Sequence, residues 1–223
     1  MDLAEADAAL AAIAAEAGGC TRCPLHLLGT RTVFGEGPTT APLMLLGEQP
    51  GDQEDRQGRP FVGPAGKVLD AALAEAGIDR ATIYLSNAVK HFKHEPRGRI
   101  RLHKTPTREE AEACRWWLDQ ELALVRPRLV VALGVTAAST LLRRKVTLNR
   151  VRGQPVALPG GQMALLTLHP SAILRMPGEE AQEAARAGLV ADLKQAAEIA
   201  AGRNAPMLDL EGGWPTPRPS RGA

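Results

Sequence analysis

The chain has 223 residues, of which 44% are hydrophobic, and its formal net charge is +2. This length and apolar content suit one domain with a continuous core, and the near-zero charge leaves any nucleic-acid signal to local segments. The start of the chain is rich in Ala and Glu and acidic, unlike a secretory signal, and no apolar run reaches membrane-spanning length. We therefore expect a soluble cytoplasmic protein.

A helix is predicted first, followed by a cysteine loop. Apolar residues recur at helical spacing over residues 3–15, and Gly18-Gly19 supplies a stop. Cys20 and Cys23 follow with the two-residue gap that metal and iron–sulfur sites use. A thioredoxin-like dithiol is the alternative, but it would need the pair at the start of a helix that follows a strand. A metal is the better interpretation in a reducing compartment.

Strands and helices then alternate along the chain. Four short aliphatic runs predict buried parallel strands at residues 43–46, 83–85, 129–133 and 164–168. Helix formers with one apolar side occupy residues 65–76, 108–124, 135–142 and 180–200, and Thr107 with Glu110 forms a capping-box pattern. This alternation predicts an α/β fold with a parallel sheet covered on both faces. Residues 1–202 are expected to form the domain, and residues 203–223 a disordered, Pro-rich tail.

Polar residues follow three of these strands. Glu48 lies in the glycine-bounded turn of residues 47–52, Asn87 follows the second strand, and His169 follows the fourth. The carboxyl ends of parallel strands share one edge of a sheet, where α/β proteins bind ligands, so we expect these side chains to converge. Phe61 is one of few aromatic residues and could stack on a nucleobase, although core packing is the usual role of a single Phe.

A strongly basic segment follows the second strand. It suits a phosphate backbone, because neutralising phosphates releases counterions, although a solvated loop can have the same composition. Its cations oppose only Glu95, and they are Lys90, Lys93, Arg97, Arg99, Arg101 and Lys104.

Two further residues could complete a metal site with the cysteine pair. Cys114 lies in the predicted helix of residues 108–124, and His91 begins the basic segment. With Cys20 and Cys23 they supply three thiolates and one imidazole, a set that accepts either zinc or an iron–sulfur cluster. Composition does not choose between the two.

Four motifs together resemble the uracil-DNA glycosylase superfamily, and most of all its iron–sulfur family-four enzymes. They are Gly47-Glu48-Gln49-Pro50-Gly51, the segment of residues 58–63, Asn87-Ala88-Val89-Lys90 and His169-Pro170-Ser171. Family-four enzymes have Glu-Ala where this chain has Glu48-Gln49 and a cysteine where it has His91, and they lack the insertion that ends at residues 101–106. All three departures are features of the UdgX-type branch.

The resemblance implies a three-layer α/β/α sandwich around a four-stranded parallel sheet, and a four-iron four-sulfur cluster of structural role on Cys20, Cys23, His91 and Cys114. It also implies a reaction on uracil-containing DNA, single-stranded and also double-stranded. UdgX-type proteins cleave the glycosidic bond of deoxyuridine and then become attached to the sugar through the histidine that matches His103. The expected product is a stable protein–DNA crosslink formed once per protein molecule.

Physical roles can be assigned to the matching residues. The nucleotide must leave the base stack, with Phe61 stacking on uracil and Asn87 bonding its polar edge, while His169 stabilises the leaving anion. We expect His103 to take the position of the water in an ordinary glycosylase, oriented by Glu48. The remaining expected site residues are Gln49 and Asp52 in the catalytic turn, and Gly47, Gly51, Arg101, Lys104 and Ser171 as substrate contacts, with Arg101 anchoring the loop or a phosphate.

Two rival functions remain open. The first is a conventional uracil-DNA glycosylase with multiple turnovers, in which the basic segment only binds DNA. The second is a non-enzymatic nucleic-acid-binding module in which zinc takes the place of the cluster. A monomer is expected as the default state.

Overall fold

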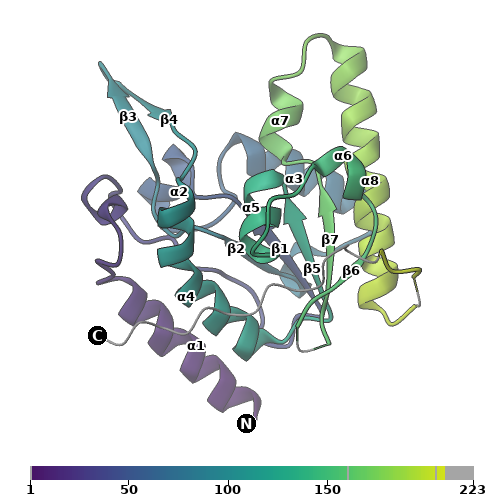
Figure 1. Cartoon of the computed structure of the whole chain (residues 1–223), viewed down its shortest axis with the longest axis horizontal. Helices are drawn as coiled ribbons and strands as arrows, with labels where there is room; N and C mark the ends of the chain where they lie inside the picture. Colours follow the sequence, from purple (N-terminus) through teal and green to yellow (C-terminus); the bar gives the residue numbers. More distant parts are fainter. Residues whose placement is uncertain (1, 160, 204, 209–223) are drawn as a thin grey trace.

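A computed structural model describes residues 2–159, 161–203 and 205–208 (Figure 1). Its strands are β1 (Leu43–Gly47), β2 (Tyr84–Asn87), β3 (His94–Arg97), β4 (Ile100–His103), β5 (Leu129–Leu133), β6 (Val156–Ala157) and β7 (Met163–Thr167). Its helices are α1 (Leu3–Ala17), α2 (Asp52–Gln57), α3 (Pro64–Glu75), α4 (Arg108–Val125), α5 (Val135–Leu141), α6 (Leu148–Val151), α7 (Pro170–Leu174) and α8 (Glu179–Ala200), with short 3-10 turns η1 (Pro24–Leu27) and η2 (Arg80–Thr82).

The main sheet has the strand order β2-β1-β5-β7-β6. The four predicted strands are present and run parallel to one another, whereas the short β6 pairs antiparallel with β7 at the edge. The sequence analysis missed β6 because two residues carry no periodic signal. The chain moves outward from β1 to β2 and then returns to β5 on the other side of β1. Such a reversal opens a crevice at the carboxyl ends of the strands.

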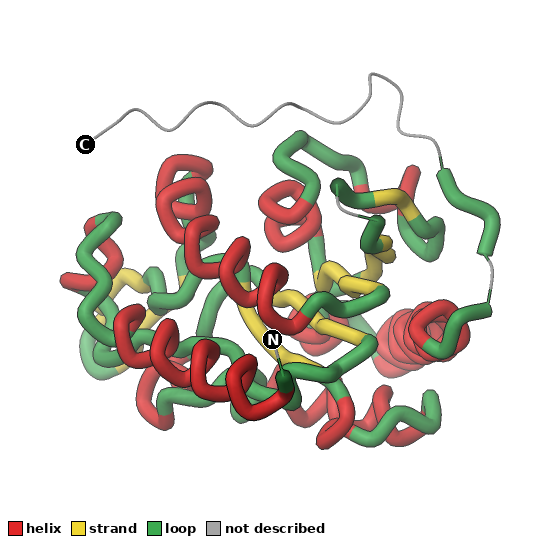
Figure 2. The backbone as a smooth tube through the Cα atoms, turned by 90° about the horizontal axis from the view of Figure 1, so that it is seen from below, coloured by secondary structure: helices red, strands yellow, loops and turns green. Residues whose placement is uncertain are grey.

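Helices cover both faces of the sheet, so the predicted three-layer α/β/α sandwich is confirmed. On one face, Leu45 and Val131 of the sheet pack against Leu69 of α3 and Leu193 of α8. On the other face, Leu46 and other strand residues pack against α4 and α5. Alternate strand residues thus enter opposite cores, as the pleat requires. Figure 2 shows the strands lying between the two sets of helices.

The second strand is tied to α4 by a buried ion pair. Lys90 Nζ lies 2.5 Å from Glu121 Oε2, and both side chains are fully buried. Glu121 also accepts hydrogen bonds from the Ser86 hydroxyl and the Gly35 backbone N–H. Because every charge in this group has a partner, its burial is tolerated, and loss of either partner would leave an unpaired charge inside the protein. The pair fixes the segment that follows β2 against α4.

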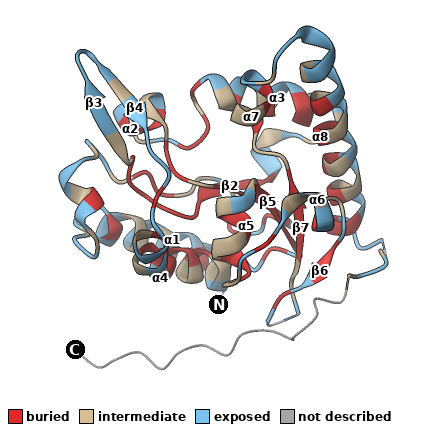
Figure 3. Cartoon of the chain, turned by 45° about the horizontal axis from the view of Figure 1, so that its top comes forward, coloured by how far each residue is buried: buried red, intermediate tan, exposed pale blue. Residues whose placement is uncertain are grey.

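The predicted basic loop forms a two-stranded hairpin in the structure. Strands β3 and β4 pair antiparallel, with His94 opposite His103, and Gly98 at the tip has a φ of +61°. Its charged composition concealed the hairpin, because neither strand has an apolar face directed at a core. The hairpin projects from the body of the molecule, and Figure 3 shows that it is largely exposed.

The described ends of the chain add two observations. Ala205 packs against the α3–α8 side of the core, and the Leu208 backbone N–H donates to Pro155 O over 2.7 Å. The expected disorder of the Pro-rich tail concerns mostly residues 209–223, which lie outside the described residues. Within the described part of the chain, each helix is too short or too polar to cross a membrane.

Candidate active site

A cavity of about 900 Å³ opens at the carboxyl ends of β1, β2 and β7. The sequence predicted a site at this carboxyl edge of the sheet, and the strand order places it at a reversal. Ten of the predicted site residues line it, and they are Glu48, Gln49, Gly51, Asp52, Phe61, Asn87, His103, Lys104, His169 and Ser171. The convergence that was expected of Glu48, Asn87 and His169 is therefore observed.

Gly47 allows two of these side chains to approach the end of β1. Gly47 lies beside Asn87 in the register of β1 and β2. A Cβ atom at position 47 would lie 2.3 Å from Asn87 Oδ1 and 2.7 Å from Phe61 Cζ, both impossible contacts. Only glycine therefore lets the Asn87 amide and the Phe61 ring meet over this strand end.

Phe61 is held in a conformation that is rare for a bulky residue. Its φ is +53°, the residue is 5% exposed, and the centroid of its ring lies 6.4 Å from that of the His169 ring. A backbone in this region costs free energy and is retained only where surrounding contacts impose it. The surrounding contacts include Gly66, where a Cβ would clash with Phe61 O. The strain places an aromatic face at the floor of the cavity.

The His169 ring has a defined tautomer. The Ser171 backbone N–H donates to His169 Nδ1 over 3.1 Å, and the Ser171 hydroxyl lies 2.8 Å from the same nitrogen. Because Nδ1 accepts, the ring proton resides on Nε2. Arg175 donates to the Ser171 hydroxyl oxygen, which leaves the hydroxyl proton for Nδ1. Ser171 thus orients His169 in this structure, where we expected a substrate contact.

His169 and Glu48 have displaced pKa values that suit different roles. Burial lowers the pKa of His169 to about 4, although the Glu48 charge opposes this shift. Burial alone would raise the pKa of Glu48, but interactions with His103 and Thr136 and the nearby imidazole of His169 hold it below its ordinary value. At neutral pH the cavity therefore contains a neutral His169 donor and an anionic Glu48.

The hairpin brings His103 to Glu48. His103 Nε2 lies 3.2 Å from Glu48 Oε1, and the His103 side chain is half exposed toward the cavity. Within the described residues, Glu48 Oε1 is a buried oxygen that no donor meets at good hydrogen-bonding geometry. A small rotation of the imidazole would complete that bond, as catalytic contacts often tighten only when substrate binds.

Arg101 anchors the hairpin to α2. The sequence analysis had expected Arg101 to anchor either the loop or a phosphate. Its Nε donates to Asp52 Oδ1 over 2.6 Å and its Nη1 to Asp55 Oδ2 over 2.5 Å. Asp55 is fully buried and also accepts the backbone N–H groups of Thr30 and Arg31. Charge-assisted bonds at such a partly buried site are stronger than surface ion pairs.

Gln49 and Phe92 hold the base of the same hairpin. Gln49 Nε2 donates to the backbone oxygens of Lys93 and Lys104, and its Oε1 accepts from the Lys93 N–H over 3.0 Å. The buried Phe92 ring lies 5.0 Å from the His94 ring, 6.2 Å from the His103 ring and 5.3 Å from the Arg101 guanidinium. The Gln49 amide is thus occupied by the hairpin in this structure.

Asp55, Phe92 and Thr136 are site residues that the sequence analysis did not identify. A signal existed for Asp55, since it lies one helical turn after Asp52 and so shares its face of α2. No comparable signal existed for Phe92, because a single aromatic residue inside a basic segment does not indicate a role. Lys104 was expected to contact the substrate. In this structure its Nζ lies 2.6 Å from Glu95 Oε2 at the surface of the hairpin.

The three cysteines of the predicted cluster site lie in one compartment between α1 and α4. Cys20, Cys23 and Cys114 belong to the same apolar cluster, with Trp117 beside them. The Lys90 backbone N–H donates to Cys114 Sγ over 3.2 Å, and Trp117 Nε1 donates to Cys20 Sγ over 3.1 Å. N–H donors of this kind stabilise thiolates bound to iron. The donor set therefore fits an iron–sulfur group in its chemistry.

The described side chains of this compartment are not arranged as a closed metal site. Among the described residues, no three Cys, His, Asp or Glu side chains are arranged closely enough to hold a metal ion. His91 is buried, and its Nε2 lies 3.0 Å from the Thr32 hydroxyl. Burial raises the pKa of Cys114 to about 12, so a thiolate there needs a cation close by.

Comparisons with known proteins identify the family to which this chain is similar. Residues 34–194 match the model of the uracil DNA glycosylase superfamily. The chain is 43% identical to the type-4 uracil-DNA glycosylase of Thermotoga maritima over 162 residues, which cover 72% of this chain and 81% of the relative. It is 40% identical to the type-4 enzyme of Pyrobaculum aerophilum over 71% of this chain and 81% of the relative, and 34% identical to the type-5 enzyme of Thermus thermophilus over 63% and 69%.

The tautomer and protonation of His169 can be measured directly. In a chain with ¹⁵N-labelled histidine, we expect the Nε2–H form at pH 7 and a titration midpoint near 4, well below the ordinary 6.5. Because the unfolded chain binds this proton first as pH falls, His169 lowers the stability of the fold between pH 6.5 and about 4. A midpoint near 6.5, or a proton on Nδ1, would contradict the described network.

Proposed function

The chain belongs to the uracil-DNA glycosylase superfamily, and we propose that it excises uracil from DNA and then binds the abasic sugar covalently through His103, as the UdgX-type branch does. The observation that carries the proposal is the contact of 3.2 Å between His103 and Glu48 at the carboxyl end of β1. The type-4 relatives support uracil excision itself. The covalent step rests on the hairpin that brings an imidazole into the cavity.

Uracil recognition is proposed for the floor of the cavity. A flipped nucleotide would stack its base on Phe61, and the Asn87 amide would pair with the polar edge of uracil. Cytosine presents the reversed donor and acceptor pattern on that edge. An Asn87 amide that is packed over Gly47 and presents its acceptor and donor to uracil would leave both groups unpaired against cytosine, so cytosine is disfavoured.

His169 is proposed to stabilise the leaving base. As the bond between C1′ and N1 breaks, the electron pair moves onto uracil and its carbonyl oxygens become more negative. The Nε2–H of a neutral, fixed imidazole can donate to such an oxygen without reorganisation. The low pKa of His169 keeps this donor neutral over the physiological range, as Ser171 keeps it oriented.

His103 is proposed to form the new bond. A lone pair on one ring nitrogen attacks the electron-poor C1′, and the ring loses the proton from its other nitrogen. Glu48 lowers the cost of the transient imidazolium, because it is an anion within contact distance. The net reaction transfers one proton from the histidine to uracil and consumes no water. The carbon–nitrogen bond to imidazole breaks slowly, so the adduct persists.

A conventional glycosylase is the second candidate, and the type-4 relatives favour it. In that enzyme Glu48 would orient a water instead, and His103, which is half exposed, would only contact DNA. The two candidates share the same uracil pocket. They differ in the number of turnovers: the conventional enzyme is released after each reaction, whereas the capturing protein stays bound to DNA after the first.

We further propose that Cys20, Cys23, His91 and Cys114 hold a four-iron four-sulfur cluster, supported by the compartment that the three cysteines share and by the N–H donors to the sulfur atoms of Cys20 and Cys114. When bound, the cluster would link α4 to the cysteine loop and so stabilise this side of the fold. The domain is proposed to act as a monomer in the cytoplasm, on single-stranded and double-stranded DNA.

Replacement of His103 separates the two candidates. We expect the wild-type protein, mixed with uracil-containing single-stranded DNA, to give a complex that survives boiling on a denaturing gel. His103→Ser should lose this complex, because serine lacks the nucleophilic ring, yet still release uracil. A boiling-resistant complex that persists in His103→Ser would overturn the role of this residue, and its absence in the wild type would favour the conventional enzyme.

The anchoring role of Arg101 predicts a graded loss of capture. Arg101→Ala removes the tie to Asp52 and Asp55, so His103 should be misplaced and the rate of crosslinking should fall by about 10². Arg99→Ala is the matched control, since Arg99 is an exposed arginine in the turn of the same hairpin and is not among the residues that line the cavity. Rates of crosslinking measured by quenched gels would show the difference, and equal rates in both variants would refute the anchor.

Metal analysis tests the cluster. Protein purified without oxygen should be brown and contain iron and sulfide, and His91→Ala should lose iron because one ligand is missing. His94→Ala should keep its iron, since that ring stacks on Phe92 in the hairpin. A colourless protein that contains zinc would reject the iron–sulfur proposal.

A further inference from the structure

A second cavity, of about 370 Å³, adjoins the active site. It lies between the start of α4 and the side of α5, and continues along the loop that follows α5. Thr105 lines both cavities, and Thr136, which lines the second one, interacts with Glu48 of the first. The two cavities are therefore neighbours along one surface, on the side of the site that faces α4 and α5.

The second cavity is strongly basic. Arg108, Arg143, Arg144 and Lys145 line it, against Glu112 as the one acid among its lining residues. Hydroxyl groups of Thr136, Ser139 and Thr140 add further hydrogen-bonding groups to its wall. Cations together with hydroxyl groups suit the oxygens of a phosphodiester.

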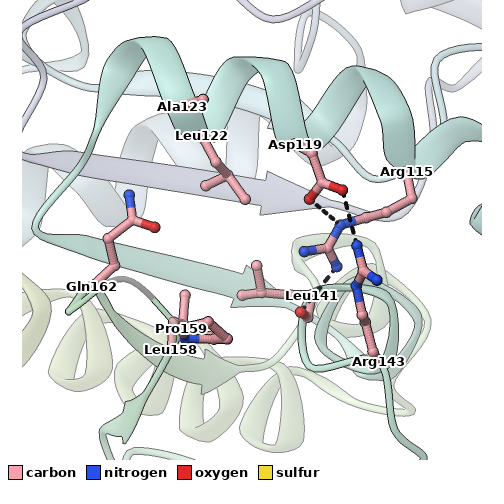
Figure 4. Close-up of a pocket in the computed structure, with 9 residues that line it drawn as sticks. All are labelled: Arg115, Asp119, Leu122, Ala123, Leu141, Arg143, Leu158, Pro159 and Gln162. Carbon is pink, nitrogen blue, oxygen red and sulfur yellow. Dashed lines mark hydrogen bonds and ion pairs between the residues drawn. The ribbon is translucent and has the colours of Figure 1, made fainter. Parts of the chain in front are cut away.

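The Arg143 side chain is held in place by an ion pair with Asp119 of α4. Its backbone has a φ of +51°, a value that residues other than glycine rarely adopt. Its Nη2 donates to Asp119 Oδ2 over 3.0 Å. Figure 4 shows the Asp119 carboxylate paired with the guanidiniums of both Arg115 and Arg143. Because one carboxylate is shared by two guanidiniums, this group of three side chains keeps a net positive charge.

We propose that this basic cavity binds the backbone phosphates of the DNA strand on one side of the flipped deoxyuridine. The inference rests on the proposed function and extends it to the neighbouring nucleotides. A strand whose uridine occupies the catalytic cavity must leave that cavity on both sides, and on one side its phosphates would pass over the adjoining basic cavity. Free phosphate has the same chemistry, so the test must distinguish a linked phosphate from an inorganic one.

Charge reversal at two exposed positions tests the subsite. Arg108→Glu/Lys145→Glu changes two exposed cations of the cavity, and a glutamate at the first position of α4 favours the helix dipole, so folding should be preserved. Lys194→Glu/Arg203→Glu makes the same charge change at exposed positions on and just beyond α8, which packs on the other face of the sheet. Melting curves of both variants confirm that each is folded.

Binding of a uracil-free single-stranded oligonucleotide is measured first, by fluorescence anisotropy at several salt concentrations. For the cavity variant we expect weaker binding and a slope of log affinity against log salt that is shallower by about 1.4, since a single strand loses about 0.7 per phosphate contact. The control variant should keep the wild-type slope. Inorganic phosphate at the concentration of the oligonucleotide should not compete. Equal slopes in the two variants, or competition by inorganic phosphate, would overturn the proposal.

Uracil release is measured second, with oligonucleotides whose uridine has flanking nucleotides on its 5′ side alone or on its 3′ side alone. The cavity variant should be slower than the control with one of these substrates and equal to it with the other. Equal slowing with both, or with neither, would overturn a one-sided subsite. If the wild type releases no uracil from any substrate, the proposed function fails, while the salt dependence still decides whether the cavity binds DNA.

Discussion

The position of His103 depends on the tie between Arg101 and the two carboxylates of α2. Hairpin β3–β4 is largely exposed, and its apolar side chains Ile100 and Leu102 are exposed as well, so neither its own pairing nor apolar burial holds it against the body of the molecule. Asp55 is buried and already accepts two backbone N–H groups, which makes it a fixed point. Arg101 connects that fixed point to the strand that ends at His103, while the Gln49 amide and the Phe92 ring secure its base. The approach of His103 to Glu48 is thus a consequence of contacts outside the cavity.

The cavity divides its chemistry between two differently charged groups. His169 is buried and neutral, with its proton directed by Ser171 to Nε2. Glu48 remains anionic despite burial, because imidazoles and the Thr136 hydroxyl surround it. A neutral donor suits the developing negative charge of a leaving base, and a carboxylate suits positive charge on the sugar or on an attacking imidazole. The same arrangement would also orient water, which is why the fate of His103 decides between the two proposed functions.

Much of the fold and of the site could be predicted from the sequence, because both rest on strong local patterns. The four aliphatic runs became the parallel strands, and Glu48, Asn87 and His169 met at their ends because parallel strands must align their carboxyl ends. The hairpin was missed because its strands are charged on both faces. Asp55 was missed because its partner Arg101 lies 46 residues further along the chain, and Phe92 was missed because its contact with the His103 ring depends on a hairpin that the sequence did not reveal. Ser171 was assigned to the substrate, since no local pattern reveals its contact with His169 Nδ1.

The central claim is that an imidazole takes the place of water at the electron-poor sugar carbon. The most direct measurement is the amount of uracil released when DNA is present in large excess over protein. If His103 captures the sugar, release stops when it equals the amount of protein, and an equal amount of protein is found attached to DNA. If release continues far beyond the amount of protein, water completes the reaction and the account of His103 is wrong.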